Sequence, residues 1–312
     1  MPLPMMTFLR LIRWPNLLIV LLTQGLLYFF VLLPPLHQHD LLPSLDVVHF
    51  GLYILVTIIL TATGYIINDL LDVAADRINK PHSRIIERQI QPATAIWLYW
   101  SLGMIGFFIS LYLALIIGRL PLLGIYPLVF WLLYGYSARL KKEALTGNLL
   151  IALFCAGVAG AVWLAEWTAI SDLARRAPHM AHKLELLFVW YMVFAFLATL
   201  YREMIKDMED VAGDRHMDCR TLPIRYGMMA ARRWSMSVGL LLLLFLSWQG
   251  WMFLRFFREW ILVFLGLGVV LPLLLSFYWL AFAQKAREFH RISTLVKVIM
   301  LNGLILLFFA NS

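Results

Sequence analysis

Residues 47–67 read VVHFGLYILVTIILTATGYII, and residues 68–77, which follow directly, read NDLLDVAADR. The first stretch is an apolar run of 21 residues, and a helix needs about 20 such residues to cross about 30 Å of hydrocarbon. Backbone polar groups cannot stay unpaired in lipid, so a run of this length predicts a membrane-spanning helix. The second stretch is acidic and begins where that helix would reach the membrane surface.

Eight more apolar runs lie along the chain. The composition agrees with them, because 62% of the 312 residues are hydrophobic, only 14% are charged and the mean hydropathy is +0.81. These values exclude a soluble enzyme of one or two domains, a disordered chain and a collagen-like chain. We therefore predict an all-α fold, a polytopic membrane bundle of nine transmembrane helices forming a single integral-membrane domain over residues 1–312. The predicted spans are 12–33, 47–67, 93–117, 121–138, 146–166, 185–205, 235–254, 259–282 and 293–310.

The basic residues are divided unevenly between the two sets of connections. Of the 26 Lys and Arg residues, 20 lie on the side of the N-terminus and 6 on the other side. Because basic loops stay in the cytoplasm, we expect a multi-pass protein of the cell (inner) membrane with a cytoplasmic N-terminus, cytoplasmic active-site loops and an external C-terminus. The basic residues are dispersed between apolar runs, so no nucleic-acid partner is expected.

The acidic stretch has a second copy. Residues 69–77 read DLLDVAADR and residues 207–215 read DMEDVAGDR, so six of nine positions are identical at a separation of 138 residues. Each copy follows an apolar run at the same predicted membrane face. One acidic stretch between membrane helices is usually a solvated loop with surface ion pairs. Two matched copies on one face favour a site built from repeated parts.

The spacing predicts that the acidic side chains share one face. At about 100° per residue, the aspartates of each copy fall within about 60° of one another on a continuous helix, with Glu203 on the same arc and Glu209 opposite. Oxygen ligands without a Cys or His pattern indicate a hard cation, Mg²⁺ or Ca²⁺, and Mg²⁺ favours one or two carboxylates together with substrate phosphates. The predicted metal ligands are Asn68, Asp69, Asp72, Asp76, Asp207, Asp210 and Asp214.

Two acidic stretches surrounded by Arg and Lys predict a diphosphate site. Metal ions would bridge the carboxylates to the diphosphate oxygens, and nearby basic side chains would neutralise the remaining charge. The predicted diphosphate-binding residues are Arg77, Lys80, Arg84, Lys141, Lys206 and Arg215.

At these residues the sequence resembles the UbiA superfamily of membrane prenyltransferases, whose fold has nine transmembrane helices. The family's first motif, N-x-x-x-D-x-x-x-D, matches residues 68–76, with Asp69 at an additional acidic position, and its second aspartate-rich motif matches residues 207–214. Residues 202–215, followed by TLPI at 221–224, are similar to the digeranylgeranylglyceryl phosphate synthase branch. Homogentisate prenyltransferases and chlorophyll synthases have related segments.

The resemblance implies Mg²⁺-dependent transfer of a prenyl group, expected to be geranylgeranyl, from its diphosphate to a membrane-associated acceptor through an allylic cation. The favoured acceptor is the hydroxyl of geranylgeranylglyceryl phosphate, and the alternative is an aromatic acceptor such as hydroxybenzoate, homogentisate or naphthoate. Either Asp72 or Asp76 would take the hydroxyl proton. Arg220 and Arg225 are expected to hold an acceptor phosphate. The expected catalytic residues are Asp72, Asp76, Asp210 and Asp214.

Two other classes of protein compete with this interpretation. A transporter would need ionisable residues along a path across the membrane, whereas the acidic residues here gather at one face. A CDP-alcohol phosphotransferase also uses clustered aspartates, but the remaining elements of its motif are missing from this chain.

Overall fold

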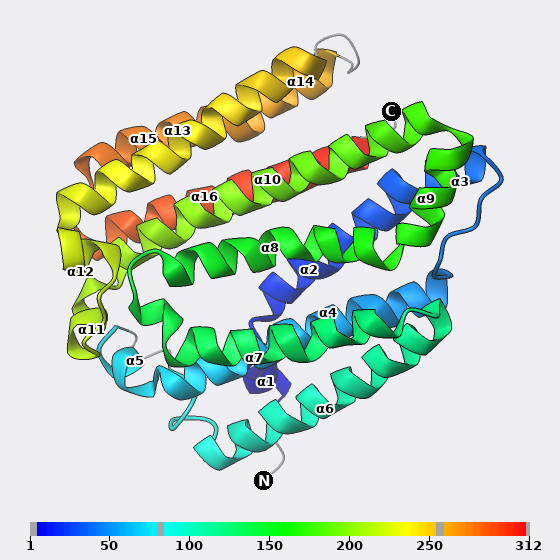
Figure 1. Cartoon of the computed structure of the whole chain (residues 1–312). Helices are drawn as coiled ribbons and strands as arrows, with labels where there is room; N and C mark the ends of the chain where they lie inside the picture. The colour runs from blue at the N-terminus through cyan, green and yellow to red at the C-terminus, as the bar shows by residue number, and fades with distance from the viewer. Residues whose placement is uncertain (1–4, 80–83, 254–258, 310–312) are drawn as a thin grey trace.

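The structure, a computed structural model, describes residues 5–79, 84–253 and 259–309. Within these ranges nine helical segments are long and apolar enough to cross a membrane, which confirms the predicted bundle (Figure 1). The helices are α1 (Met5–Leu11), α2 (Trp14–Leu26), η1 (Leu27–Leu32), α3 (Leu33–Gln38), α4 (Val47–Leu71), α5 (Val73–Asn79), α6 (Pro92–Ile117), η2 (Leu120–Gly124), α7 (Ile125–Ala138), η3 (Leu140–Lys142), α8 (Thr146–Ala165), α9 (Trp167–Arg176), α10 (Pro178–Glu209), α11 (Val211–His216), α12 (Leu222–Tyr226), α13 (Met228–Phe253), α14 (Glu259–Leu265), η4 (Gly266–Val270), α15 (Leu271–Phe282), α16 (Ala286–Leu306) and η5 (Leu307–Phe309).

Three spans begin about two turns earlier than the apolar runs predicted. Helices α10, α13 and α16 begin at Pro178, Met228 and Ala286, whereas the predicted starts were 185, 235 and 293. The additional turns carry Lys, Arg, Glu and His side chains together with good helix formers. A prediction based on hydropathy ends an apolar run at such polar residues. The helix itself continues through them, because they lie where it leaves the hydrocarbon.

The spans form two groups that lie side by side in Figure 1. In the first group α4 packs against α2, α6 and α7, and in the second group α10 packs against α8, α13 and α16. Contacts between α2 and α8 join the groups within the bundle. Because α4 and α10 each carry one acidic segment at their C-terminal ends, this arrangement gives each group one half of the predicted site.

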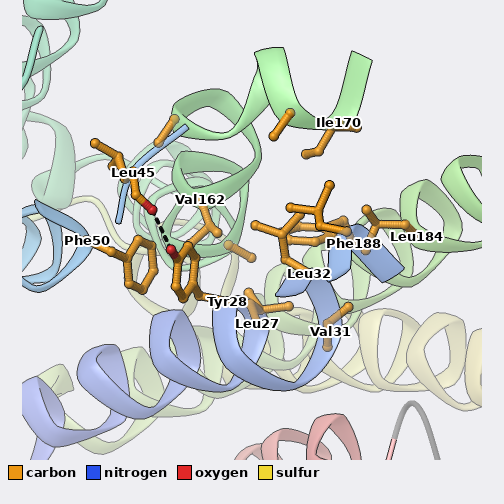
Figure 2. Packing of buried hydrophobic residues seen from close by; sticks show 14 of the residues in the cluster. Leu27, Tyr28, Val31, Leu32, Leu45, Phe50, Val162, Ile170, Leu184 and Phe188 are labelled. Atoms are coloured by element: carbon orange, nitrogen blue, oxygen red, sulfur yellow. Dashed lines mark hydrogen bonds between the residues drawn. The ribbon is translucent and has the colours of Figure 1, made fainter. Parts of the chain in front are cut away.

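The end of the bundle away from the acidic segments has a closed core. Tyr28 stacks on Phe50 with ring centroids 3.7 Å apart, and its hydroxyl donates a hydrogen bond to the carbonyl of Leu45 (Figure 2). Glu166, between α8 and α9, is fully buried and accepts hydrogen bonds from the backbone amides of Ser44 at 2.7 Å and Leu45 at 3.1 Å. A buried polar group needs such partners, so Glu166 fixes the loop that precedes α4.

The short helix α9 was not predicted from the sequence. It buries Ala169, Ile170 and Leu173 on one face and carries Arg175 and Arg176 in its last turn. A ten-residue amphipathic helix is too short to appear as a membrane span. It lies across the end of the bundle that the closed core occupies (Figure 1).

Candidate functional site

Both helices that carry an acidic segment break at the middle aspartate of the motif. Asp72 has φ −94° and ψ 3°, and Asp210 has φ −94° and ψ 6°. Beyond each break a short helix continues, and the backbone N–H groups of Asp76 and Asp214 donate to the carbonyls of Asp72 and Asp210 at 2.8 and 3.1 Å. The helix that carries each motif is therefore not continuous, as the predicted arc assumed, and the break comes before the last aspartate of each motif.

The short helices that follow the breaks bring the two motifs together. Helix α5 contacts α11 at one end of the bundle (Figure 1). Asp214 on α11 also lies within electrostatic reach of Asp72, from the first motif, and of Lys141. The two halves of the predicted site thus face each other.

The connection between α7 and α8, together with the first turn of α8, links both motifs. The Lys141 ammonium bonds the carboxylate of Asp72 and donates to the amide oxygen of Asn68 at 3.2 Å. Seven residues later, the Asn148 amide donates a 2.8 Å hydrogen bond to Asp207. Sequence reasoning assigned Lys141 to the diphosphate but did not assign Asn148, whose partner lies 59 residues away in the chain.

Gly147 allows this connection to pass close to the start of α8. A Cβ atom at position 147 would lie 2.7 Å from the Cα of Lys141 and 3.0 Å from the carbonyl oxygen of Leu140. These are backbone atoms, which cannot move aside as a side chain can. The absence of a side chain at Gly147 therefore helps to place Lys141 between the motifs.

The carboxylate of Asp214 is partly buried and lies near the carboxylates of Asp210 and Asp72. Burial, followed by the negative charge of Asp210, raises the pKa of Asp214 to about 6, while Thr221 donates a 3.4 Å hydrogen bond to its carboxylate. Like charges in one site raise the pKa of a carboxyl group, and a shared cation would lower it again.

Arg13 is a site residue that sequence reasoning missed. Its guanidinium forms a 2.7 Å ion pair with Asp69 and lies over the ring of Tyr65, 4.8 Å from the centroid. Asn16 donates to the hydroxyl of the same tyrosine at 3.1 Å. Arg13 precedes the first span and is 56 residues from Asp69, so only the folded chain brings them together.

The other predicted diphosphate-binding residues differ in their placement. Arg77 and Arg84 both pair with Glu87, at 2.8 and 3.6 Å, and Arg77 is 59% exposed. The ammonium of Lys206 forms an ion pair with the carboxylate of Glu203 at 3.2 Å. Arg215 is exposed on α11, and Lys80 lies outside the described residues.

The two residues predicted to bind an acceptor phosphate are exposed. The backbone N–H of Arg220 donates to the carbonyl of Lys142 at 2.6 Å, which ties the loop after α11 to the connection before α8. The guanidinium of Arg225 lies over the ring of Tyr226, 5.2 Å from its centroid. Glu209, predicted to lie opposite the aspartates, pairs with His290 on α16 at 2.9 Å.

The sequence profile of the UbiA prenyltransferase family matches residues 40–298 of this chain. The digeranylgeranylglyceryl phosphate synthase of Sulfurisphaera tokodaii is 30% identical over 253 residues, which cover 80% of this chain and 83% of that protein. The enzyme of the same name from Methanopyrus kandleri is 35% identical over 178 residues, covering 57% of this chain and 58% of that protein.

Solved structures share the fold. A structure of digeranylgeranylglyceryl phosphate synthase has a TM-score of 0.62 and 23% sequence identity, with 97% of each chain covered. A UbiA homolog from Archaeoglobus fulgidus bound to DMAPP and Mg²⁺ has a TM-score of 0.55 and 17% identity, with 96% of this chain and 99% of that chain covered.

Proposed function

Because the chain belongs to the UbiA prenyltransferase family, we propose that it transfers a geranylgeranyl group from its diphosphate to the hydroxyl of geranylgeranylglyceryl phosphate, with Mg²⁺ as the metal. The observation that carries this proposal is the contact between α5 and α11, which faces one aspartate motif toward the other at one end of a membrane bundle. The named activity of the two relatives supports the choice of acceptor.

The donor atoms of the motifs fit Mg²⁺. The predicted ligands are six aspartates and one asparagine, which bind metal through oxygen, and among the described residues no three His, Cys, Asp or Glu side chains are already grouped as a metal site. Mg²⁺ commonly takes one or two carboxylates and completes its shell with water and substrate phosphate. The raised pKa of Asp214 is consistent with carboxylates arranged to share a cation. The Archaeoglobus homolog binds Mg²⁺ with a prenyl diphosphate.

We assign the diphosphate to the space between the motifs. Asn68, Asp72 and Asp207 would hold it through the metal, which when bound neutralises the charge that develops on the leaving diphosphate. Lys141 is the basic residue placed to contact it directly, because its ammonium already lies beside Asp72 and Asn68. Arg215 on the neighbouring helix α11 is a second candidate, whereas Arg77 and Arg84 would first have to leave Glu87.

The proposed reaction forms one ether bond. The bond between the allylic C1 and the diphosphate oxygen breaks, and the diphosphate leaves with the electron pair. The acceptor hydroxyl oxygen then bonds to C1, and its proton passes to a carboxylate of the first motif, Asp72 or Asp76. The apolar helices that carry the motifs would shield the allylic cation from water, which would otherwise capture it.

The test uses purified protein in lipid nanodiscs with geranylgeranyl diphosphate and Mg²⁺. The acceptors are geranylgeranylglyceryl phosphate, 4-hydroxybenzoate, homogentisate and a naphthoate, and products are identified by mass. We expect an ether product with the first acceptor and its loss in Asp72→Asn, in Asp210→Asn and after chelation of Mg²⁺. Product formation from an aromatic acceptor alone would show a different substrate class, and substantial activity in either variant would contradict the two-motif site.

We also propose that the end of the bundle with the motifs faces the cytoplasm, because 20 of the 26 basic residues lie on that side. This orientation is tested by introducing single cysteines into a protein in which Cys155 and Cys219 are replaced by Ser. A membrane-impermeant maleimide applied to intact cells should label Arg175→Cys and should not label Asp218→Cys. The reverse labelling pattern would invert the topology.

A further inference from the structure

Two cations bond one buried carboxylate beside the motifs, and two more lie within electrostatic reach of it. Glu203 on α10 accepts hydrogen bonds from Arg202 at 2.6 Å and from Lys206 at 3.2 Å, and its side chain is only 11% exposed. Arg13, which precedes α2, lies within electrostatic reach of Glu203. Lys297 on α16 lies within electrostatic reach of Arg13, Arg202, Glu203 and Lys206. We call Arg13, Arg202, Glu203, Lys206 and Lys297 the Glu203 cluster.

The Glu203 cluster extends to the depth of the apolar spans. The ion pair between Glu209 and His290 fixes the register of the antiparallel helices α10 and α16 near their ends. Arg202 lies seven residues before Glu209 and Lys297 lies seven residues after His290, so both lie about 10 Å deeper along their helices. Ionisable residues at membrane depth are energetically unfavourable and usually mark a functional site.

The Glu203 cluster carries more positive than negative charge. Glu203 pairs with Arg202 and Lys206, and Asp69 pairs with Arg13. No ion pair is found for Lys297 within the described residues, and Asp76 and Asp207 lie within electrostatic reach of Arg13 and Lys206. The Nε atom of Arg202 is buried and has no hydrogen-bond partner among the described residues. A bound anion would supply the acceptor that this nitrogen lacks.

The Glu203 cluster borders the proposed reaction centre. The Tyr136 hydroxyl, on α7, lies within electrostatic reach of Glu203 and Arg13 and also of Asp72 and Asp207. An anion held by the cluster would therefore lie next to the space between the motifs. A hydroxyl a few bonds from that anion would reach the prenyl donor.

We propose that the Glu203 cluster binds the phosphomonoester of the acceptor lipid, an inference that rests on the proposed function. A phosphomonoester carries a charge of about −1.5 to −2 near neutral pH and three acceptor oxygens, which suits a cluster of four cations and one carboxylate. A headgroup attached to an isoprenoid chain is delivered at membrane depth, where Arg202 and Lys297 lie. Arg220 and Arg225 are exposed and lie beyond the end of α10, so they are less suited to such a ligand.

The variant that tests this site is Lys297→Met, because Met suits an apolar helix and the residue is exposed rather than packed in the core. The matched control is Arg287→Met, which removes an exposed cation from the first turns of the same helix. Rates are measured with geranylgeranylglyceryl phosphate and with the dephosphorylated alcohol, geranylgeranylglycerol, at varied donor concentration. Lys297→Arg shows whether a cation alone restores function.

We expect Lys297→Met to lower kcat/KM for the phosphorylated acceptor about 10- to 100-fold, the effect of losing one charge-assisted hydrogen bond. The donor KM and the rate with the alcohol should stay unchanged, and Lys297→Arg should recover most of the loss. Inorganic phosphate should compete with the acceptor in the wild type and compete less in Lys297→Met. An unchanged acceptor kcat/KM, a raised donor KM, or competition of phosphate with the donor would each overturn the proposal.

A binding measurement separates this proposal from the proposed function. Geranylgeranylglyceryl phosphate without donor should raise the Tm of the wild type and of Arg287→Met, and should raise that of Lys297→Met much less. If the wild type forms no ether product, the proposed function fails while this shift still reports on the phosphate site. If the shift is equal in all three proteins, the phosphate site fails whatever the enzyme produces.

Discussion

The side-chain amide of Asn148 donates a 2.8 Å hydrogen bond to the carboxylate of Asp207, seven residues along the chain from the ammonium that bonds Asp72. Residues 141–148 thereby contact both motifs, one on each of the two helix groups. The relative position of the motifs therefore depends on residues 139–148 as well as on helix packing.

Lys141→Met should reduce prenyl transfer by about 100-fold or more. The substitution removes the ammonium beside Asp72 and Asn68, and a preorganised cation aimed at developing negative charge commonly contributes that much. The measurement is kcat with saturating prenyl diphosphate and acceptor. Lys142→Met is the control, since no side-chain bond to a motif residue is found for Lys142 within the described residues, and an equal loss in both variants would argue against a specific role for Lys141.

Asn148→Ala should lower kcat/KM about tenfold and raise the Mg²⁺ concentration needed for half-maximal activity. Hydrogen bonds that orient a metal-binding carboxylate typically change metal affinity or activity by about 10- to 100-fold. The control is Asn302→Ala, which removes a 2.7 Å hydrogen bond to the carbonyl of Gly268. An identical Mg²⁺ dependence in wild type and Asn148→Ala would refute the role of this bond.

Gly147→Ala should impair both stability and activity. The new methyl group would lie 2.7 Å from the Cα of Lys141, and relieving such a contact costs about 1–3 kcal/mol and shifts the backbone that positions the ammonium. Gly157→Ala, also on α8, meets no atom within 4 Å and should change neither property. Tm in detergent and initial rates report the two effects, and a Gly147→Ala protein with wild-type rates would contradict the expected displacement.

Glu166 should make the stability of the protein depend on pH. Burial raises the pKa of Glu166 above its ordinary value of 4.5, although the amides of Ser44 and Leu45 act in the opposite direction. A carboxyl group whose pKa is higher in the folded state contributes stability below its unfolded pKa, and that contribution is lost as pH rises through the folded pKa. The stability of the wild type relative to Glu166→Gln should therefore fall as pH increases from 4.5.

Thermal unfolding in detergent at a series of pH values tests this sign. Glu185→Gln, which removes a carboxylate that is 59% exposed, is the control for loss of a carboxylate. A difference between wild type and Glu166→Gln that grows with pH would contradict the prediction.

The sequence was sufficient for the number of spans and for the two motifs. Apolar runs decide where a chain crosses hydrocarbon, and the repeated D-x-x-D-V-A-x-D-R pattern identifies a paired site without coordinates. The breaks at Asp72 and Asp210 were not predicted, because neither motif contains the proline that commonly marks a break. The roles of Arg13 and Asn148 were not predicted either, since their partners lie 56 and 59 residues away in the chain.

Basic residues were the least predictable part of the site. Arg77 and Arg84 lie near the first motif in the chain, yet both turn to Glu87. Lys141 lies 69 residues from Asp72 and bonds it. Long flexible side chains choose partners according to tertiary distance and local charge, and proximity in sequence gives little information about either.

The bond from Lys141 to Asp72 affects how a metal ion can bind to the first motif. The ammonium of Lys141 is bonded to the carboxylate of Asp72, which we assign to a divalent metal ion. Lys141 therefore occupies part of the position that the ion would take. A metal ion that binds alone must displace the ammonium of Lys141 from Asp72. When the ion binds together with prenyl diphosphate, the diphosphate oxygens can bond the displaced ammonium. Loading of metal and prenyl diphosphate should for this reason be synergistic, with each binding weakly until the other is present.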